Sequence, residues 1–305
     1  MNNNQVLRIK TISELHRLRG LPKPEHPLIS VINLESVEHG PGTEPVSLVY
    51  DFYSIGLKRN CNAKFRYGQQ EFDFDEGVMF FMSPHQVLTI QPGDDKEHQQ
   101  TGWMLLIHPD FFWNTSLAKS IRQYEYFDYS VNEALFLSEK EETTIINIIR
   151  NIRQEYHSNI DKYSQDIIIA QLEVLFNYSD RFYHRQFITR KITNHQILER
   201  LEAILTEYFN GDVFEKGLPT VHYIAGELNV SPNYLSSMLK VLTGQSTQQH
   251  IHNKLIEKAK ERLSTTDLSV SQIAYELGFE HSQSFSKLFK RKTRLTPVEF
   301  RNSFS

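Results

Sequence analysis

One helix-pair pattern occurs twice within residues 221–293 of this 305-residue chain. Its first half, Val-x-x-Ile-Ala-x-Glu-Leu, begins at Val221 and again at Val270. Its second half has the pattern apolar-Ser-x-x-apolar-Lys-x-x-Thr. This pattern begins at Leu235 and again at Phe285. The offset is 49 residues for the first half and 50 for the second, which predicts one extra residue in the second turn. Two short turns between helices predict two helix-turn-helix units.

In the first unit, Ser231-Pro232 predicts a helix start, because serine is a favoured N-cap and proline fits the first helical position. Ala225 supplies the small side chain that two closely crossing helices need. Leu235 and Leu239 belong to the inner face of the second helix, together with Met238. We expect the start and outer face of this helix to contact nucleic acid through Ser231, Asn233, Tyr234, Ser236, Ser237 and Lys240.

The second unit repeats this arrangement with different side chains. Ser269 and Gln272 have the spacing of a capping box, and Ala274 again marks the crossing. Phe285 and Phe289 are expected to point inward, with Leu288 between them. The candidate contact residues of this helix are His281, Ser282, Gln283, Ser286, Lys287, Lys290 and Arg291.

A connecting helix is predicted over residues 247–263, where Ile251, Leu255, Ala259 and Leu263 recur every four residues. Such a helix would hold the two units at a fixed separation. Successive major-groove faces of DNA lie about 34 Å apart. One chain could therefore reach two adjacent grooves.

At this level of detail the tail resembles the C-terminal domain of the AraC/XylS family of bacterial transcription regulators, over about residues 195–304. The resemblance rests on Ile273-Ala274-Tyr275-Glu276-Leu277-Gly278-Phe279, on Phe285-Ser286-Lys287-x-Phe289-Lys290-Arg291, and on Leu295-Thr296-Pro297-x-x-Phe300-Arg301. It implies that helices near 231–242 and 282–292 enter adjacent major grooves. It also implies a cupin-like N-terminal domain that binds an effector and dimerises.

Three positions depart from the family pattern. Arg294 stands where a glycine usually follows the second recognition helix, which predicts either a left-handed or an altered cap at a cost of about 1 kcal/mol. Gln283 and Ser284 replace the usual Ser-aromatic pair at the start of that helix. The first unit keeps its cap glycine, Gly244, and we expect it to dominate base recognition.

Side-chain chemistry separates the expected roles. Short polar side chains can reach base edges, and we assign base or groove contacts to Asn233, Ser237, Gln283 and Lys287. Phosphate contacts, which make affinity sensitive to salt, are assigned to Lys240, Lys290, Arg291 and Lys292. Tyr234 is left with two alternatives, stacking on a sugar or packing locally.

The N-terminal part of the chain shows a strand pattern instead of a helical one. Residues 1–28 contain Pro22, Pro24 and Pro27 and are expected to form an irregular arm. Short apolar or alternating runs separated by turn residues then predict an all-β sandwich or small barrel over residues 29–108. The family resemblance implies that it is a cupin-like barrel. The expected strands cover residues 29–34, 47–55, 63–67, 70–74, 78–82, 86–90 and 102–107.

Helical periodicity replaces the strands from residue 138 onward. Ser138 and Glu141 have capping-box spacing, and an apolar stripe follows through Ile145 and Ile152. A second helix is expected over residues 164–187, with a stripe of Ile168, Leu172, Leu175, Phe176 and Ser179. This pair could pack on its own sheet or on a second subunit. The expected domains are therefore residues 1–188 and the all-α residues 195–305, joined near residues 189–194.

Charge divides the chain in the same way. The net charge of −4 separates into +4 over residues 215–305 and −8 over residues 1–214. This asymmetry favours a nucleic-acid-binding module attached to a domain with another role.

An effector pocket is the remaining candidate site. At the barrel mouth we expect aromatic walls and polar groups from Tyr53, Lys58, Tyr67, His85 and Trp103. Residues 68–82 lack histidine, and His85 and His98 are isolated, so the sequence shows no cupin metal-ligand set and predicts neither metal nor cofactor. His250 and His252 are two apart on a predicted helix and point away from each other.

Several function classes are excluded or ranked at this stage. Cys61 is the single cysteine, which rules out an intrachain disulfide and disfavours alkyl transfer. No signal or membrane segment is expected, so we place the protein in the cytoplasm, without a membrane partner. The sequence predicts a non-enzymatic transcription regulator that binds double-stranded DNA as a homodimer, with an effector and RNA polymerase as further partners. The alternatives are a ligand-independent DNA-binding protein whose front domain only dimerises, and a cupin enzyme with a DNA-binding tail.

Overall fold

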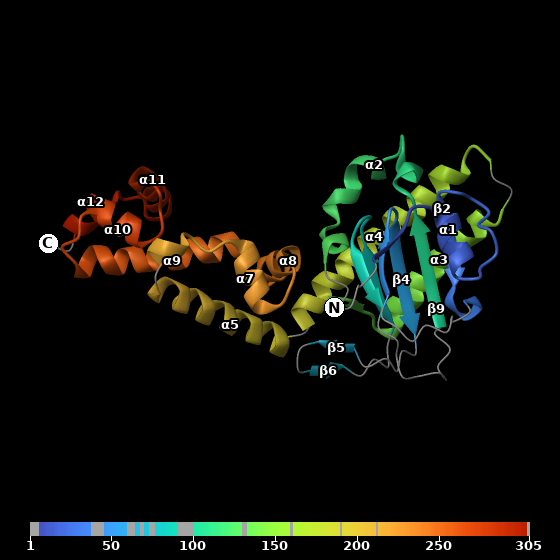
Figure 1. The fold of residues 1–305 in the computed structure, drawn as a ribbon, viewed down its shortest axis with the longest axis horizontal. Coiled ribbons are helices and arrows are strands. Elements are labelled where there is room, and N and C mark those ends of the chain that lie inside the picture. The colour runs from blue at the N-terminus through green and yellow to red at the C-terminus, as the bar shows by residue number, and fades with distance from the viewer. Residues whose placement is uncertain are drawn as a thin grey trace. The chain divides into compact units, whose positions relative to one another are not determined.

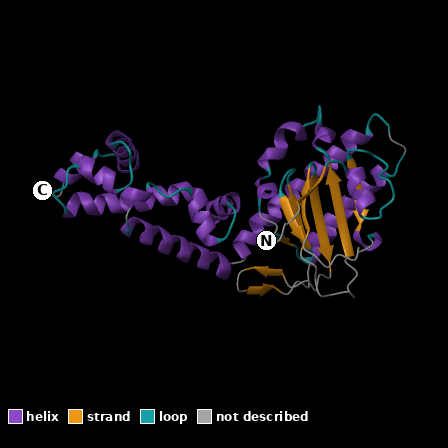
Figure 2. Ribbon diagram, viewed as in Figure 1, coloured by secondary structure: helices purple, strands orange, loops and turns teal. Residues whose placement is uncertain are grey.

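The computed structural model describes residues 6–37, 46–59, 65–67, 70–72, 77–90, 101–129, 133–158, 161–189, 191–211 and 213–303. The chain falls into two compact units, Met1–Gln186 and Phe187–Ser305. The strands of the described residues lie in the first unit, and the second is helical (Figure 2). The predicted fold class, a cupin-like β-rich domain with helices followed by an all-α domain, is confirmed.

The first unit is built around two sheets. The larger one is antiparallel and has the order β10 (Leu135–Phe136), β7 (Val78–Met82), β4 (Tyr53–Arg59), β9 (Thr101–Ile107) and β2 (Ile29–Asn33). The smaller one has the order β1 (Val6–Ile9), β3 (Val46–Tyr50) and β8 (Val87–Ile90), with β1 parallel to β3. A separate hairpin joins β5 (Phe65–Tyr67) to β6 (Gln70–Phe72).

The expected irregular arm is wrong for residues 6–18, which form β1 and the helix α1 (Ile12–Leu18). Thr11 caps α1 by accepting a hydrogen bond from the Glu14 amide at 3.1 Å. The three prolines that suggested irregular chain all follow α1 and do not interrupt it. One buried core cluster then joins this segment to both sheets, through Ile9, Ile12, Leu15, Ile32, Leu48, Tyr50, Phe52 and Leu106.

The run over residues 47–55, expected as one strand, is divided between β3 and β4, which belong to different sheets. The chain turns at Asp51 and Phe52. The Phe52 ring is fully buried and stacks on Tyr50 at 5.0 Å, while Asp51 accepts a hydrogen bond from Arg8 Nε at 2.8 Å. Burial of Phe52 between the sheets explains why an apolar run without glycine or proline still changes sheet.

Short helical segments link β9 to β10, and two long helices follow. The short ones are η2 (Pro109–Phe112), α2 (Leu117–Ser120), η3 (Ile121–Gln123) and η4 (Glu125–Asp128). The long ones are α3 (Glu139–Tyr156) and α4 (Ser164–Thr189), and the capping box predicted at Ser138 forms. The predicted stripes of both helices are buried. Because α3 packs beside β2 and Tyr183 of α4 lies 6.2 Å from Phe81 of β7, the pair covers its own sheet (Figure 1).

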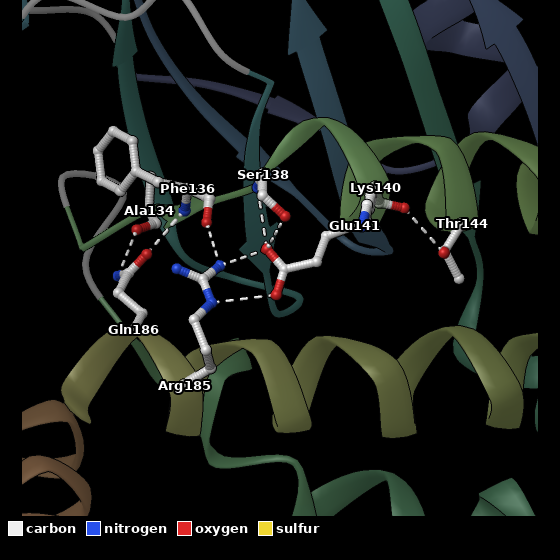
Figure 3. Close-up of polar contacts among 8 residues, drawn as sticks. All are labelled: Ala134, Phe136, Ser138, Lys140, Glu141, Thr144, Arg185 and Gln186. Atoms are coloured by element: carbon white, nitrogen blue, oxygen red, sulfur yellow. Dashed lines mark hydrogen bonds and ion pairs between the residues drawn. The ribbon is translucent and has the colours of Figure 1, made fainter. Parts of the chain in front are cut away.

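A polar network ties the end of α4 to the start of α3 (Figure 3). Arg185 donates to both carboxylate oxygens of Glu141, at 3.0 and 2.6 Å, and to the Phe136 carbonyl at 2.7 Å. Gln186, which is buried, accepts from the Phe136 amide at 2.8 Å and donates to the Ala134 carbonyl at 3.1 Å. These bonds satisfy the backbone amide and carbonyl of Phe136 in β10 and the carbonyl of Ala134, which precedes that strand.

The second unit contains eight helices among its described residues. They are α5 (Lys191–Asn210), α6 (Val213–Lys216), α7 (Val221–Leu228), α8 (Pro232–Thr243), α9 (Thr247–Thr265), α10 (Val270–Glu276), α11 (Ser282–Thr293) and α12 (Pro297–Asn302). Over residues 189–194, the expected linker, the described positions are helical: Thr189 ends α4 and α5 begins at Lys191. No helix within the described ranges is both long and apolar enough to cross a membrane.

Candidate nucleic-acid interface

The turn between α7 and α8 depends on one left-handed residue. Asn229 has φ 56° and ψ 42°, a conformation that asparagine tolerates better than most side chains. Its amide donates to the Gly226 carbonyl at 3.0 Å, and the Val230 amide donates to the Ala225 carbonyl at 3.0 Å. These bonds close α7, so that the chain can start α8 two residues later at Ser231.

The turn between α10 and α11 repeats this geometry 49 residues later. Gly278 has φ 82° at the position equivalent to Asn229, and the Phe279 amide donates to the Ala274 carbonyl at 3.0 Å. His281, the N-cap of α11, lies 50 residues after Ser231. The predicted one-residue insertion is therefore confirmed and lies at Glu280.

The left-handed caps that end α8 and α11 are also equivalent. Gly244 has φ 73° and donates to the Lys240 carbonyl at 3.0 Å. Arg294 has φ 66° and donates to the Lys290 carbonyl at 2.8 Å. Of the two caps predicted for Arg294, left-handed or altered, the structure shows the left-handed one.

Both second helices bury the inner faces that the repeat predicted. Leu235, Met238 and Leu239 are buried in α8, and Phe285 and Phe289 are buried in α11 together with Leu288. Ala225 and Ala274, at the two helix crossings, are also buried. Each unit therefore presents the opposite, polar face of its second helix.

On α8 the polar residues are more engaged than the sequence suggested. Tyr234 was expected on the outer face, but it is buried, and its ring lies 5.2 Å from that of Phe187. Ser231 is buried as the N-cap, and Ser236 shares a hydrogen bond of 3.0 Å with Thr247. Asn233 and Ser237 are partly exposed, whereas Lys240 is exposed. Local packing is thus the alternative that the structure shows for Tyr234.

The outer face of α11 is more open. Its exposed residues are His281, Gln283, Lys287, Lys290 and Arg291, and the partly exposed ones are Ser282 and Ser286. No carboxylate in the described part of the chain lies within ion-pair distance of Lys287, Lys290 or Arg291. These three cations, which form no ion pair in the described part of the chain, give this face a positive potential suited to phosphate.

The connecting helix α9 holds the two helix-turn-helix units apart. Its 19 residues correspond to roughly 28 Å of helix, which is comparable with the spacing of adjacent major grooves. Thr247 at its start bonds to α8 through Ser236. Arg301 of α12 donates to the Leu263 and Leu268 carbonyls at 3.3 and 2.6 Å, near the other end.

Two histidines of α9 lie near the ends of α8 and α11. Burial lowers the pKa of His252, and the neighbouring cations Lys292 and Arg291 lower it further. Its Nε2 lies 3.0 Å from the amide nitrogen of Gln248, so it accepts a hydrogen bond when neutral. Burial also lowers the pKa of His250, which bonds to Thr243 at 2.9 Å.

The expected effector residues of the first unit lie in different surroundings. The Tyr53 ring packs 5.1 Å from Phe127, and burial raises its pKa. His85 is exposed, with its Nδ1 3.3 Å from an Asp51 oxygen. Tyr67 lies in β5, and its side chain is outside the described part of the structure.

Strand register separates two further residues of that expected site. Trp103 is paired with Leu57 across β9 and β4, so these two residues share a face of the sheet. Lys58 follows Leu57 and points to the opposite face, where its Nζ lies 5.4 Å from the Phe80 ring. The structure therefore does not bring Lys58 and Trp103 together.

Metal-ligating residues do not cluster within the described ranges, where no three His, Cys, Asp or Glu side chains could hold one ion. Cys61 lies outside those ranges.

Two family matches correspond to the two units. Residues 224–303 match a helix-turn-helix domain family, and residues 48–172 match the AraC-like ligand binding domain. Together these segments cover about two thirds of the chain. The chain belongs to the AraC/XylS family. The helix-turn-helix match contains both recognition helices, α8 and α11, and the ligand-binding match extends from β3 into α4.

Several relatives are named as transcription regulators. A regulator of Pseudoalteromonas carrageenovora is 34% identical over 38% of this chain and 64% of its own length. The activator RhaS of Salmonella schwarzengrund is 31% identical over 44% of this chain and 46% of its own length. The solved C-terminal domain of AraT, a response regulator of Geobacillus stearothermophilus, is 31% identical over 35% of this chain and 84% of that domain, with a TM-score of 0.31. The chain thus spans less than two thirds of these two full-length relatives.

Proposed function

We propose that this AraC/XylS family member is a sequence-specific DNA-binding transcription regulator that responds to a small-molecule effector. The observation that carries this proposal is the duplicated DNA reader, which consists of the helix-turn-helix units α7–α8 and α10–α11. Two equivalent helices expose polar faces, and a 19-residue helix separates their units. Asn233 and Ser237 of α8, and Gln283 and Lys287 of α11, are the proposed base or groove contacts. The proposed phosphate contacts are Lys240, Lys290, Arg291 and Lys292.

The proposed domains of the chain are residues 1–188 and residues 195–305. The first of them has the proposed roles of effector binding and homodimer formation. Its match to the AraC-like ligand binding domain supports the effector role. One relative, from Pediococcus pentosaceus, is named a raffinose operon transcriptional regulatory protein. A sensing first unit and a DNA-reading second unit would place this protein in the cytoplasm, where it meets DNA and RNA polymerase, and would give it no enzymatic activity.

Footprinting with the full chain tests DNA binding. The substrates are promoter fragments, including the region upstream of the protein's own gene. Two readers held one groove apart should protect two patches whose centres are about 10 base pairs apart. A variant with Lys287→Ala, Lys290→Ala and Arg291→Ala should weaken the protection through loss of phosphate and groove contacts. If no promoter fragment is protected at low salt, the proposal fails.

A ligand-independent regulator is the second candidate. It is favoured by the packed core between the two sheets, where α1 and both sheets bury eight residues together. A thermal-shift screen separates the two candidates, because a ligand that binds only the folded state raises the melting temperature by mass action. A stabilising ligand that also changes DNA affinity supports the effector-responsive form. Stabilisation without such a change supports the second candidate.

A further inference from the structure

A cleft of about 540 Å³ lies in the first unit, between the β2–β9 edge of the large sheet and helix α3. It is lined by Asn33, Trp103, Arg150, Arg153, Gln154 and His157. The last four residues have the spacing i, i+3, i+4 and i+7, so Arg150, Arg153 and Gln154 share one face of α3 and His157, its C-cap, follows them. Trp103 and Asn33 are directly paired across β9 and β2 and form the opposite wall.

The cleft is distinct from the packed space between the two sheets. Trp103 shares a sheet face with Leu57, whereas the core cluster contains Ile32 and Leu106 from the opposite face. The cleft therefore lies on the helix-covered side of the large sheet. It is open to solvent, because the four lining residues of α3 and its C-cap are exposed.

Two guanidinium groups give the cleft its chemistry. Arg153 lies over the Trp103 ring, 5.3 Å from its centroid, which orients the guanidinium plane and leaves its N–H edge available. Arg150 precedes it by one helical turn on the same face. Within the described part of the chain, neither arginine forms an ion pair. A pair of adjacent guanidiniums without carboxylates matches an oxyanion, which accepts their parallel N–H donors.

The remaining polar groups complete the pattern of donors. His157 Nδ1 bonds to Glu25 at 2.6 Å, which fixes the ring, and no residue in the described part of the chain bonds to Nε2. The Glu35 carboxylate accepts a hydrogen bond from the Asn33 side-chain amide at 3.4 Å, and the Glu35 backbone amide donates to Asn33 Oδ1 at 3.1 Å. The two carboxylates near the cleft are thus held at its rim, and the guanidiniums keep their charge for a ligand. Both rim carboxylates would repel a large polyanion, so the site favours a small one.

We propose that this cleft binds a small organic acid through its carboxylate or phosphate group, held between Arg150 and Arg153 with its carbon skeleton against Trp103. Oxyanion binding does not depend on any role in transcription. As an effector site, however, the cleft rests on the proposed function, because it then names the chemical class of the effector.

Fluorescence of Trp103 provides the first test. The chain has two tryptophans, and the exposed Trp113 can be replaced in a Trp113→Phe background, so that emission reports on the cleft alone. The probes are inorganic phosphate, glucose 6-phosphate, gluconate and benzoate, with glucose and benzamide as neutral counterparts. We expect saturable quenching or enhancement by at least one anionic organic probe and none by its neutral counterpart. The phosphate and carboxylate probes distinguish the two sources of the oxyanion.

Arginine variants identify the site. Arg150→Gln and Arg153→Gln should each weaken the binding of the responding probe by at least about tenfold, whereas Arg153→Lys should fall between. Arg181→Gln is the matched control, because this arginine is exposed on α4 and does not line the cleft. Circular dichroism checks folding, and Arg150→Gln keeps the test valid if Arg153→Gln disturbs Trp103. Absence of response to every anionic probe overturns the proposal, and so does affinity that both Gln variants leave unchanged.

A DNA-binding arm separates the two levels of the inference. The responding probe is added to the full chain on its footprinted DNA site, and the change in affinity is compared between wild type and Arg150→Gln. A change that Arg150→Gln abolishes supports the effector role. If the probe binds but DNA affinity is unaltered, the effector role is overturned while oxyanion binding stands. If no DNA is bound at all, the proposed function fails without affecting the fluorescence result.

Discussion

At the scale of single residues, Arg294 carries an identifiable backbone strain. It ends α11 with φ 66°, a conformation that glycine adopts freely and that a residue with a Cβ adopts only at a cost. Arg294→Gly should therefore stabilise the second unit by about 1 kcal/mol. Urea denaturation followed by circular dichroism measures the change.

The equivalent cap offers a reciprocal control. Gly244 has φ 73° and no heavy atom within 4 Å of an added Cβ, so Gly244→Ala should lose about 1 kcal/mol through backbone strain alone. If both substitutions shift the free energy of unfolding in the same direction, left-handed strain is not the cause.

His252 predicts a dependence of stability on pH. Its pKa in the folded protein lies below the ordinary value of 6.5, because burial and the cations Lys292 and Arg291 disfavour the protonated ring. The stabilisation is complete above pH 6.5 and is lost as the pH falls through the lowered folded pKa. The urea midpoint of the second unit should therefore decrease on acidification from pH 7.5, and His252→Gln should make this decrease smaller. An unchanged pH profile in the variant would rule out this role.

Residue-level prediction from the sequence failed where the partner came from outside the repeat. The repeat correctly placed Leu235, Met238 and Leu239 inside, since these positions follow helical periodicity. It placed Tyr234 outside, yet the ring is buried against Phe187, which lies far from the repeat in sequence. Arg150 and Arg153 were also missed, because exposed arginines on an amphipathic helix are common unless a facing aromatic is known.

At the scale of elements, the turn between α10 and α11 depends on Gly278. A Cβ there would lie 2.9 Å from the backbone carbon of Gly217 and 3.0 Å from Val213 Cγ1, and its φ is 82°. Gly278→Ala should destabilise the second unit by about 2 to 4 kcal/mol, since overpacking adds to backbone strain. Thermal or urea unfolding of the full chain measures the loss.

Gly226 provides the comparison within the equivalent helix pair. It is exposed in α7, and an added Cβ would meet nothing within 4 Å. Gly226→Ala should stabilise the unit by about 0.5 to 1 kcal/mol, because alanine is the better helix former. If both alanine variants behave alike, close approach at Gly278 does not govern the turn.

The helices of the second unit could be predicted because local signals specify them. Capping residues at Ser231, Ser246, Ser269 and Thr296 mark helix starts, and each accepts the expected backbone hydrogen bond. The strands of the first unit were harder, because their pairing is non-local. The apolar pattern of residues 47–55 is compatible with one strand or with two. Only packing across the two sheets separates β3 from β4.

The same difficulty affected the expected effector site. Tyr53 and Trp103 lie toward opposite ends of the paired strands β4 and β9, and Lys58 points to the other face. Residues that are close in sequence or similar in chemistry need not share a sheet face, because side chains alternate along each strand. A one-residue difference in register decides which of them meet.

At the scale of the whole molecule, the two readers need not contribute equally. The second reader departs from the family pattern at Gln283, Ser284 and Arg294, so we expect the first to discriminate bases more strongly. Asn233→Ala or Ser237→Ala should relax operator choice more than Gln283→Ala, by about 1 to 3 kcal/mol for each lost base contact. Selection of bound sequences from a random library measures the preference at each base. Because α11 is more exposed than α8, the opposite result is the competing expectation. A larger loss of base preference in Gln283→Ala than in the α8 variants would contradict the assignment.

The charge distribution of the chain predicts how affinity depends on salt. Residues 215–305 carry a net charge of +4 within a chain of −4, so this segment must supply the attraction to DNA. Lys290 and Arg291 are exposed on α11, and each phosphate contact should contribute about 0.9 to the slope of log affinity against log salt concentration. The double variant Lys290→Ala, Arg291→Ala should therefore lower that slope by about 2 while leaving sequence preference unchanged. Lys216→Ala is the control, because this exposed lysine lies on α6, outside both recognition helices, and should leave the slope unaltered. A double variant that changes base preference but keeps the slope would assign these side chains to the bases instead of the phosphates.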